Sequence, residues 1–201
     1  MKTPRFLLSA LDAAQFPEPS APEVAFLGRS NVGKSSLLNA LVGSRQAKVS
    51  STPGRTRAIN FFALFPDAKA AEHNAPPSLI LADLPGYGYA KISKSISAEW
   101  PKFINPYLTD RPTLALCICL VDTNIPPQES DAQLLAFLRA HRRNFLVVGT
   151  KSDKLSSNKL VQSTTALRRE LAVDTVLPCS AKTKAGMKEL WVRMKELEQP
   201  A

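Results

Sequence analysis

The sequence contains no apolar run long enough to cross a membrane. Its longest wholly apolar run covers residues 114–121, whereas a membrane-spanning helix needs about 20 residues. Lys2 and Arg5 precede a short apolar stretch near the N-terminus, but Asp12 and Pro17 interrupt that stretch too early for a secretory signal peptide. We therefore expect no stable membrane insertion and a cytoplasmic location.

Cysteine is also scarce, with Cys117, Cys119 and Cys179 as the three examples. An odd number does not complete a set of disulfides, and the spacing matches no zinc motif. Cys117 and Cys119 are two residues apart in an apolar run, so in a strand they would share one face. We expect buried, reduced thiols, which is typical of cytosolic proteins.

Acidic residues are nearly missing from two stretches of the chain. The sequence has 26 Lys+Arg against 17 Asp+Glu, giving a net charge of +9. Residues 44–57 contain four basic residues and no acid, and residues 139–169 contain eight basic residues and one acid, Asp153. Such stretches favour a polyanionic partner, most simply RNA. A solvated basic surface is the alternative that charge alone leaves open.

The remaining pattern is an alternation of short apolar strands and amphipathic helices. We predict strands at 23–27, 59–65, 78–83, 114–121, 145–148 and 175–177. We predict helices at 34–42, 96–108, 128–141, 158–171 and 185–197. This alternation indicates an α/β fold with a mostly parallel sheet and helices on both faces. Ligands of such sheets bind at the carboxyl ends of the strands.

Two proline-containing segments lie outside these elements. Residues 17–22 should be extended, and residues 66–77 should be a loop between two strands, with the appearance of an insertion. We expect residues 1–22 to form a lead-in segment packed on a single nucleotide-binding domain, residues 23–201. No internal repeat is visible.

The segment from Gly28 to Ser35 matches G-x-x-x-x-G-K-S between a predicted strand and a predicted helix. Small residues let backbone N–H groups and the helix N-terminus surround a polyphosphate. Lys34 should reach the β- and γ-phosphates, and the Ser35 hydroxyl should ligate Mg²⁺. The nucleotide-binding residues that we expect here are Gly28, Arg29, Ser30, Asn31, Val32, Gly33, Lys34, Ser35 and Ser36. Alone, this motif does not separate ATP from GTP.

A second motif, Asp83-Leu84-Pro85-Gly86, ends the predicted strand 78–83. Asp83 at this place can hold Mg²⁺ through a water molecule. Gly86 can bring its backbone N–H to a γ-phosphate because it has no Cβ. We therefore expect Asp83, Leu84, Pro85 and Gly86 to line the nucleotide site.

The loop at residues 50–57 should supply a second Mg²⁺ ligand and act as a switch ordered by the γ-phosphate. Thr56 is our choice, with Thr52 as the weaker alternative, and Gly54 and Arg55 should lie near the nucleotide. Together these motifs assign catalytic roles to Lys34, Thr56 and Gly86. Arg55 and its neighbour Arg57 could contact phosphate or RNA, or be ordinary surface arginines.

The last two motifs follow strands near the C-terminal half of the chain. In Thr150-Lys151-Ser152-Asp153, the carboxylate can accept hydrogen bonds from guanine N1–H and its exocyclic amine, which adenine does not offer. Lys151 can lay its stem over the base. In the segment Cys179-Ser180-Ala181, a backbone N–H near Ala181 should reach guanine O6. The order and spacing of the four motifs predict a guanine nucleotide site.

Nearly the whole chain, about residues 5–197, resembles the EngB/YsxC family of bacterial ribosome-biogenesis GTPases. The segments that carry the resemblance are GRSNVGKSSLLNAL, TPGRTRAINFF, DLPGYGYAK and TKSDKL. The resemblance implies the P-loop NTPase fold with a six-stranded sheet, exchange of GDP for GTP, and hydrolysis of GTP with Mg²⁺. It also implies a role in assembly of the large ribosomal subunit and in normal cell division. The large subunit or its rRNA is then the expected partner. We expect a monomer, because no further apolar face is evident in the sequence.

Two positions bear on catalysis. Many small GTPases carry a glutamine directly after Asp-x-x-Gly to orient the attacking water. Here that position is Tyr87, so we expect slow intrinsic hydrolysis. Asn31 resembles the P-loop asparagine of potassium-activated GTPases, and a K⁺ beside it would supply positive charge. The alternative interpretation is that Asn31 only shapes the loop.

The sequence departs from the usual family pattern after the central strand, where Asp122-Thr123-Asn124 stands in place of Asp-x-Arg. This puts a local contact in doubt, but not the nucleotide site. Rival interpretations are an ATP-using P-loop kinase, an RNA-binding scaffold that nucleotide only stabilises, and a protein of the membrane surface. The short, nearly neutral N-terminal segment disfavours the last.

Overall fold

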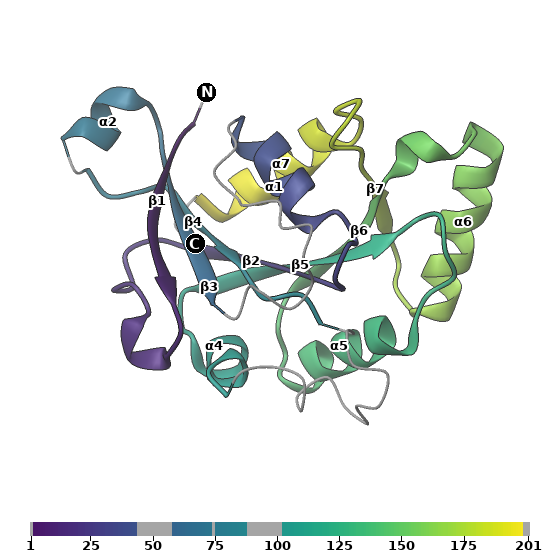
Figure 1. The fold of residues 1–201 in the computed structure, drawn as a ribbon, viewed down its shortest axis with the longest axis horizontal. Helices are drawn as coiled ribbons and strands as arrows, with labels where there is room; N and C mark the ends of the chain where they lie inside the picture. The colour runs from purple at the N-terminus through teal and green to yellow at the C-terminus, as the bar shows by residue number, and fades with distance from the viewer. Residues whose placement is uncertain (1, 44–57, 74, 88–101, 199–201) are drawn as a thin grey trace.

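The computed structural model describes residues 2–43, 58–73, 75–87 and 102–198. These residues form one sheet of seven strands in the order β1-β3-β4-β2-β5-β6-β7 (Figure 1). The strands are β1 (Thr3–Ala10), β2 (Glu23–Gly28), β3 (Ile59–Phe65), β4 (Leu79–Asp83), β5 (Leu114–Asp122), β6 (Phe145–Thr150) and β7 (Val176–Pro178).

Most of the sheet is parallel. Strand β2 pairs in parallel with β4 and β5, and β5, β6 and β7 continue the parallel ladder. At the other edge, β3 is antiparallel to both of its neighbours, β1 and β4. The predicted α/β class with a mostly parallel sheet is confirmed. The count of six strands implied by the family resemblance is one too low.

The additional strand is β1, which lies within the expected lead-in. It pairs with β3 from Thr3 opposite Phe65 to Ala10 opposite Ile59, with an irregularity between Phe6 and Leu8. Phe6 packs edge-on against Phe62. The segment was hard to recognise from sequence because an edge strand with one face partly exposed lacks the continuous apolar run of a central strand.

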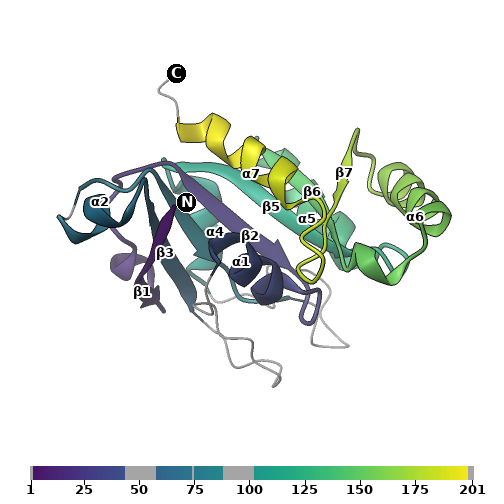
Figure 2. The ribbon, with the colours of Figure 1, turned by 90° about the horizontal axis from the view of Figure 1, so that it is seen from above.

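Helices cover both faces of the sheet. They are α1 (Lys34–Val42), α2 (Ala68–Glu72), α4 (Ile104–Asp110), α5 (Glu129–Ala140), α6 (Ser157–Glu170) and α7 (Met187–Lys195). Short 3₁₀ turns add η1 (Ala13–Gln15), η2 (Ser152–Lys154) and η3 (Glu196–Glu198). Figures 1 and 2 show α1 and α7 on one face and α4 and α5 on the other.

Two of these helices correct the sequence prediction. The segment 66–77 is not wholly a loop, because it contains α2, which Asp67 caps by accepting a hydrogen bond from the Ala70 N–H at 2.9 Å. Of the predicted helix 96–108, residues 104–108 are helical, and α4 extends two residues further to Asp110. Residues 96–101 lie outside the described ranges. Among the described residues, no helix is long and apolar enough to span a bilayer.

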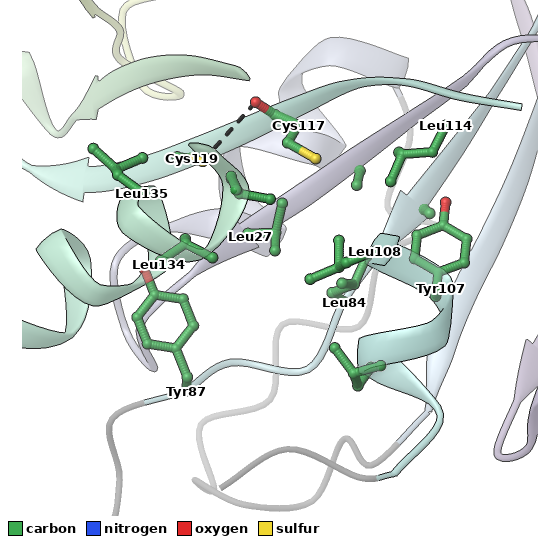
Figure 3. Close-up of a cluster of buried hydrophobic side chains, with 14 of the residues drawn as sticks. Leu27, Leu84, Tyr87, Tyr107, Leu108, Leu114, Cys117, Cys119, Leu134 and Leu135 are labelled. Atoms are coloured by element: carbon green, nitrogen blue, oxygen red, sulfur yellow. Dashed lines mark hydrogen bonds between the residues drawn. The ribbon is translucent and has the colours of Figure 1, made fainter. Parts of the chain in front are cut away.

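Each face of the sheet has its own apolar core. Leu37 and Leu41 of α1 pack with Leu190 and Met194 of α7 on one face. The other core takes its helical members from α4, α5 and α6, and Figure 3 shows part of it. Cys117 and Cys119 both lie in that second core, as their spacing predicted, and all three cysteines are buried free thiols. The two-sided burial explains why the central strands are apolar on both faces.

A buried ion pair fixes the start of β2. Glu23 is fully buried, and its Oε1 accepts hydrogen bonds from Arg111 Nη2 at 2.6 Å and Thr113 Oγ1 at 2.7 Å. Its Oε2 accepts one from the Tyr107 hydroxyl at 2.8 Å. Arg111 also donates to the Pro17 carbonyl at 2.5 Å. The network therefore ties the segment before β2 and the end of α4 to the central strand.

Candidate functional site

The P-loop connects the buried strand β2 to helix α1. Gly28 is tightly enclosed, because a Cβ there would lie 2.7 Å from Val32 Cγ1 and 3.1 Å from Leu120 Cβ. Gly33 has φ +102° and directly precedes the first residue of α1. Asn31 also has a positive φ, 65°. These left-handed residues turn the chain so that the free N–H groups of the α1 N-terminus face the loop, which is the arrangement that binds phosphate.

The end of β4 lies directly beside the P-loop. Asp83 is opposite Phe26 of β2 in the parallel register and is 4% exposed. Its Oδ1 accepts a hydrogen bond from Lys34 Nζ, which makes the two side chains an ion pair. Leu84 continues into the core and donates its N–H to the Phe26 carbonyl at 3.2 Å. The structure therefore brings the predicted lysine and the predicted aspartate together.

Gly86 approaches the P-loop so closely that a side chain would not fit comfortably. A Cβ on Gly86 would lie 3.1 Å from Ser30 Oγ and 3.2 Å from Ser30 N. The Ser30 N–H donates to the Tyr87 carbonyl at 3.1 Å, and the Tyr87 N–H donates to the Gly28 carbonyl at 3.4 Å. Pro85 is buried beside it, and Gly86 itself is exposed. The segment 83–86 is thus attached to the phosphate cradle by backbone contacts.

The side chain of Tyr87 is part of the core on the α5 face of the sheet, where Leu134 and Leu135 also lie (Figure 3). It is 2% exposed, and its hydroxyl donates to Asp131 Oδ1 at 3.3 Å. Arg29 Nε reaches the same carboxylate at 3.1 and 3.2 Å. Burial and the neighbouring Asp131 raise the pKa of the Tyr87 phenol well above its usual range, so the phenol stays protonated.

A second part of the site is a cavity of about 270 Å³ at the ends of β6 and β7. It is lined by Gly33, Ser36, Leu37, Thr150, Lys151, Asp153, Lys154, Ala181 and Lys182. The cavity therefore joins the P-loop with the Thr150–Asp153 motif and the Ser180–Ala181 turn, both of which lie more than 100 positions after the P-loop in the sequence. Its walls combine apolar stems with one exposed carboxylate.

Asp153 is oriented by the turn that follows β7. Ser180 Oγ donates to Asp153 Oδ1 at 2.6 Å and accepts from the Lys182 and Thr183 N–H groups at 3.1 and 3.0 Å. The hydrogen bond from Ser180 keeps the pKa of the Asp153 carboxyl below its usual range. Asp153 is therefore an anionic acceptor at neutral pH, as the reading of guanine requires.

The two loops of the cavity are fixed to the P-loop and to each other. Thr150 Oγ1 donates to the Val32 carbonyl at 2.5 Å. Lys151 Nζ donates to the Asn31 carbonyl at 2.9 Å and to Asp122 Oδ2 at 2.7 Å. The buried Ser152 N–H donates to the carbonyl of the buried Cys179 at 3.2 Å. Base-reading and phosphate-binding segments thus form one connected arrangement.

The structure places most of the predicted site residues at this edge of the sheet. Ser35 is in the first turn of α1, next to Lys34. Gly54, Arg55 and Thr56 lie outside the described residues. Sequence reasoning missed four residues, Leu37, Asp122, Lys154 and Lys182. Lys154 and Lys182 each directly follow a base-binding motif, and this adjacency could have indicated that they line the site. Leu37 gave no such indication, because its apolar side chain in a helix is typical of a core residue.

Comparison with known proteins agrees with this geometry. Residues 23–151 match a family model described as 50S ribosome-binding GTPase. The chain is 64% identical over 188 residues to the "Probable GTP-binding protein EngB" of Acidobacterium capsulatum, covering 94% of this chain and 87% of that protein. It is 57% identical over 192 residues to the protein of the same name in Koribacter versatilis, covering 96% and 92%.

Solved structures show the same fold. One, described as the crystal structure of a probable GTP-binding protein engB, has a TM-score of 0.64 and 23% identity, covering 88% of this chain and 98% of that one. Another is Era in complex with MgGDPNP and nucleotides 1506–1542 of 16S ribosomal RNA, with a TM-score of 0.70 and 21% identity, covering 90% of this chain and 58% of that one.

The fold, the phosphate cradle and the base cavity define a GTP-binding protein of the P-loop GTPase class. Within that class, the chain belongs to the EngB family.

Proposed function

We propose that this GTPase is a GTP-controlled switch in assembly of the large ribosomal subunit, and that normal cell growth and division depend on it. The observation that carries the switch is the contact between the P-loop and residues 83–86, where Asp83 pairs with Lys34 and Gly86 packs on Ser30. A γ-phosphate entering the cradle must change these contacts. The matching family model, described as a 50S ribosome-binding GTPase, supports the partner.

Each part of the site has a role in this proposal. The P-loop amides and Lys34 bind the phosphates, and Gly86 donates its N–H to the γ-phosphate. Asp153 accepts the two guanine donors, the stem of Lys151 covers one face of the base, and the backbone near Ala181 meets guanine O6. Because Ser180 holds the carboxylate of Asp153 in place, the site is organised for guanine before the nucleotide binds.

The described residues fit a magnesium ion, which the GTPase family generally uses. The Asp83 carboxylate is a hard oxygen donor beside the phosphate cradle, and Ser35 supplies a hydroxyl from the first turn of α1. We assign Ser35 as a direct ligand and Asp83 as a ligand through water, with Thr56 of the 50–57 loop as the further ligand. When bound, Mg²⁺ would neutralise charge on the β- and γ-phosphates.

Hydrolysis by the protein alone should be slow. The side chain that follows Gly86 is the buried Tyr87, whose hydroxyl is engaged by Asp131, so it does not orient a water molecule at the γ-phosphate. Asn31 remains the candidate for a K⁺ ligand that offsets charge in the transition state. GTP turnover should then be faster in K⁺ than in Na⁺ at matched ionic strength, and equal rates would remove Asn31 from this role.

Part of the basic stretch 139–169 is free to meet a polyanion. Arg139 and Arg143 donate to backbone carbonyls within the protein, so their charges serve the fold. Five other basic side chains are exposed: Arg142, Lys154, Lys159, Arg168 and Arg169, the last of which lies 3.8 Å from the Glu170 carboxylate. This supports rRNA or the ribosomal particle as the partner of a cytoplasmic monomer.

Sedimentation with large ribosomal subunits tests the proposal. The pure protein is mixed with the subunits at fixed physiological salt in GDP, in a non-hydrolysable GTP analogue, and without nucleotide. Salt is held constant because contacts to phosphate depend strongly on it. The proposal predicts co-sedimentation with the analogue and little with GDP. Equal weak binding in all three conditions would contradict a GTP-controlled switch.

A further inference from the structure

Asp122 is a buried carboxylate beside the base cavity, and the proposed roles of the nucleotide site do not include it. It is the last residue of β5, lies opposite Thr150 in the parallel register with β6, and is 9% exposed. Its Oδ2 accepts from Lys151 Nζ at 2.7 Å. Its Oδ1 accepts from both the backbone N–H and the side-chain Nδ2 of Asn124, each at 2.9 Å. Both carboxylate oxygens are therefore used.

Lys151 needs these contacts because its backbone is in an unfavourable conformation. Its backbone φ of 58° lies in the left-handed region, which residues other than glycine, asparagine and aspartate seldom adopt. Asn124 Nδ2 donates to the Lys151 carbonyl at 3.2 Å. Lys151 Nζ is held between Asp122 Oδ2 and the Asn31 carbonyl of the P-loop. The residue is thus fixed at its backbone and at the end of its side chain.

The stem between these two fixed points forms a wall of the base cavity. Lys151 lines the cavity together with Gly33 and Asp153. A Cβ added to Gly33 would lie 3.8 Å from Lys151 Cε, which is ordinary contact distance. The position of the stem relative to the P-loop therefore depends on the Asp122 carboxylate that holds its amine.

The charge state of Asp122 agrees with this arrangement. Burial alone would raise the pKa of its carboxyl, but the hydrogen bonds from Lys151 and Asn124 outweigh burial and lower the pKa below its usual range. Asp122 is therefore anionic at neutral pH and forms a charge-assisted contact with the lysine.

We propose that Asp122 and Asn124 are positioning residues for guanine nucleotides, which fix Lys151 against the P-loop and thereby slow nucleotide dissociation. Asp122 acts indirectly, through the Lys151 stem that covers the face of the base. The hydrogen-bonding edge of the base is read by Asp153. The departure from the family pattern at Asn124 is then functional: its amide joins the Asp122 carboxylate to the Lys151 backbone. This inference rests on the proposed reading of guanine by Asp153.

The test measures the dissociation rate of a fluorescent GDP analogue from the full chain and from Asp122→Asn, Asn124→Ala and Asp174→Asn. Asp174→Asn removes the same charge from an exposed position and is the matched control. We expect about tenfold faster dissociation for Asp122→Asn, about threefold for Asn124→Ala, and no change for the control. Asn124 is exposed, so its variant should fold even where the buried substitution does not.

Competition by GDP and IDP separates this role from the reading of the base edge. IDP lacks the exocyclic amine, so its affinity relative to GDP reports on Asp153. Asp122→Asn should weaken both nucleotides by the same factor, and Asp153→Asn should change their ratio. GDP dissociation within twofold of the unmodified chain in both Asp122→Asn and Asn124→Ala would overturn the inference. A normal GDP to IDP ratio in Asp153→Asn would instead overturn the proposed reading of guanine by Asp153.

A purely structural role for Asp122 has a different signature. It would lower the melting temperature of the nucleotide-free protein but leave the increase on adding GDP unchanged. The positioning role predicts a smaller increase with GDP in Asp122→Asn, because ligand stabilisation follows affinity. An unchanged increase together with unchanged dissociation rates would therefore contradict the inference.

Discussion

The hydroxyl of Tyr87 donates to Asp131 Oδ1 at 3.3 Å, while Arg29 Nε donates to the same carboxylate. Tyr87 directly follows the glycine proposed to sense the γ-phosphate, and Arg29 belongs to the P-loop. One buried carboxylate at the start of α5 therefore holds both phosphate-proximal segments. The role of Tyr87 is one of anchoring, in the place where other small GTPases carry a catalytic glutamine.

Tyr87→Phe should lower the free energy of unfolding by about 1 kcal/mol, the usual contribution of a buried hydrogen bond. Intrinsic GTP hydrolysis should stay within a few-fold of the unmodified chain, because the hydroxyl points into the core. Urea denaturation and single-turnover hydrolysis measure the two effects. A large loss of hydrolysis with unchanged stability would show that the hydroxyl acts in catalysis.

Asp153→Asn should exchange guanine preference for xanthine preference. An amide at this position offers a donor, and xanthine carries an acceptor where guanine has its amine. Competition between GDP and XDP for a fluorescent nucleotide checks the exchange, with Lys188→Ala on the exposed side of α7 as a control. An unchanged GDP affinity in the Asp153 variant would remove that residue from base recognition.

Glu23→Gln should destabilise the protein by about 3 kcal/mol, because Arg111 would keep its buried charge without a counter-charge. The exposed Glu72→Gln should change stability by less than about 0.5 kcal/mol. Urea denaturation of both variants gives the comparison. Equal stabilities would mean that the buried network at the start of β2 contributes no more than a surface charge.

Gly186→Ala should cost about 3 kcal/mol through steric overlap and backbone strain. A Cβ at Gly186 would lie 2.1 Å from the Pro178 carbonyl oxygen, and the residue has φ +72°. The turn that carries Ser180 would have to move, so GDP binding should weaken as well. Thermal unfolding with and without GDP reports both effects, and a fully stable variant would contradict the described geometry of this turn.

The cysteine thiols should resist modification in the native protein at pH 8. Burial raises the pKa of Cys117 and Cys179 to about 12, and raises that of Cys119 well above its usual range. Because the thiolate is the reactive form, reactivity should stay low until the pH approaches 12 or the protein unfolds. Colorimetric thiol titration with and without denaturant tests this, and rapid native labelling would contradict it.

Local patterns predicted the central part of this fold well. The helix expected at 34–42 coincides with α1, and the strand expected at 59–65 coincides with β3. Strand β1 was missed because its stability comes from pairing with β3, some 50 residues later in the chain, and not from its own apolar pattern. Helix α2 was missed because it is shorter than the two turns that make a periodic signal visible.

The motifs likewise indicated the site, but not the contacts that organise it. The sequence placed Asp83 and Lys34 in one site and Asp153 and Ser180 in another part of it, because all four belong to motifs at the carboxyl ends of strands. Nothing local connects Asp131 with Tyr87, 44 positions away. Pairings of this kind are fixed only when the helices pack on the sheet, so they become visible in the structure alone.

The ion pair between Lys34 and Asp83 couples two functions that the motifs assign separately. The amine expected to bind the β- and γ-phosphates and the carboxylate expected to hold a metal-bound water share one contact, so a change of charge at one alters the field at the other. Phosphate affinity and metal affinity should therefore change together in a variant of either residue, and neither substitution alone reports on a single function.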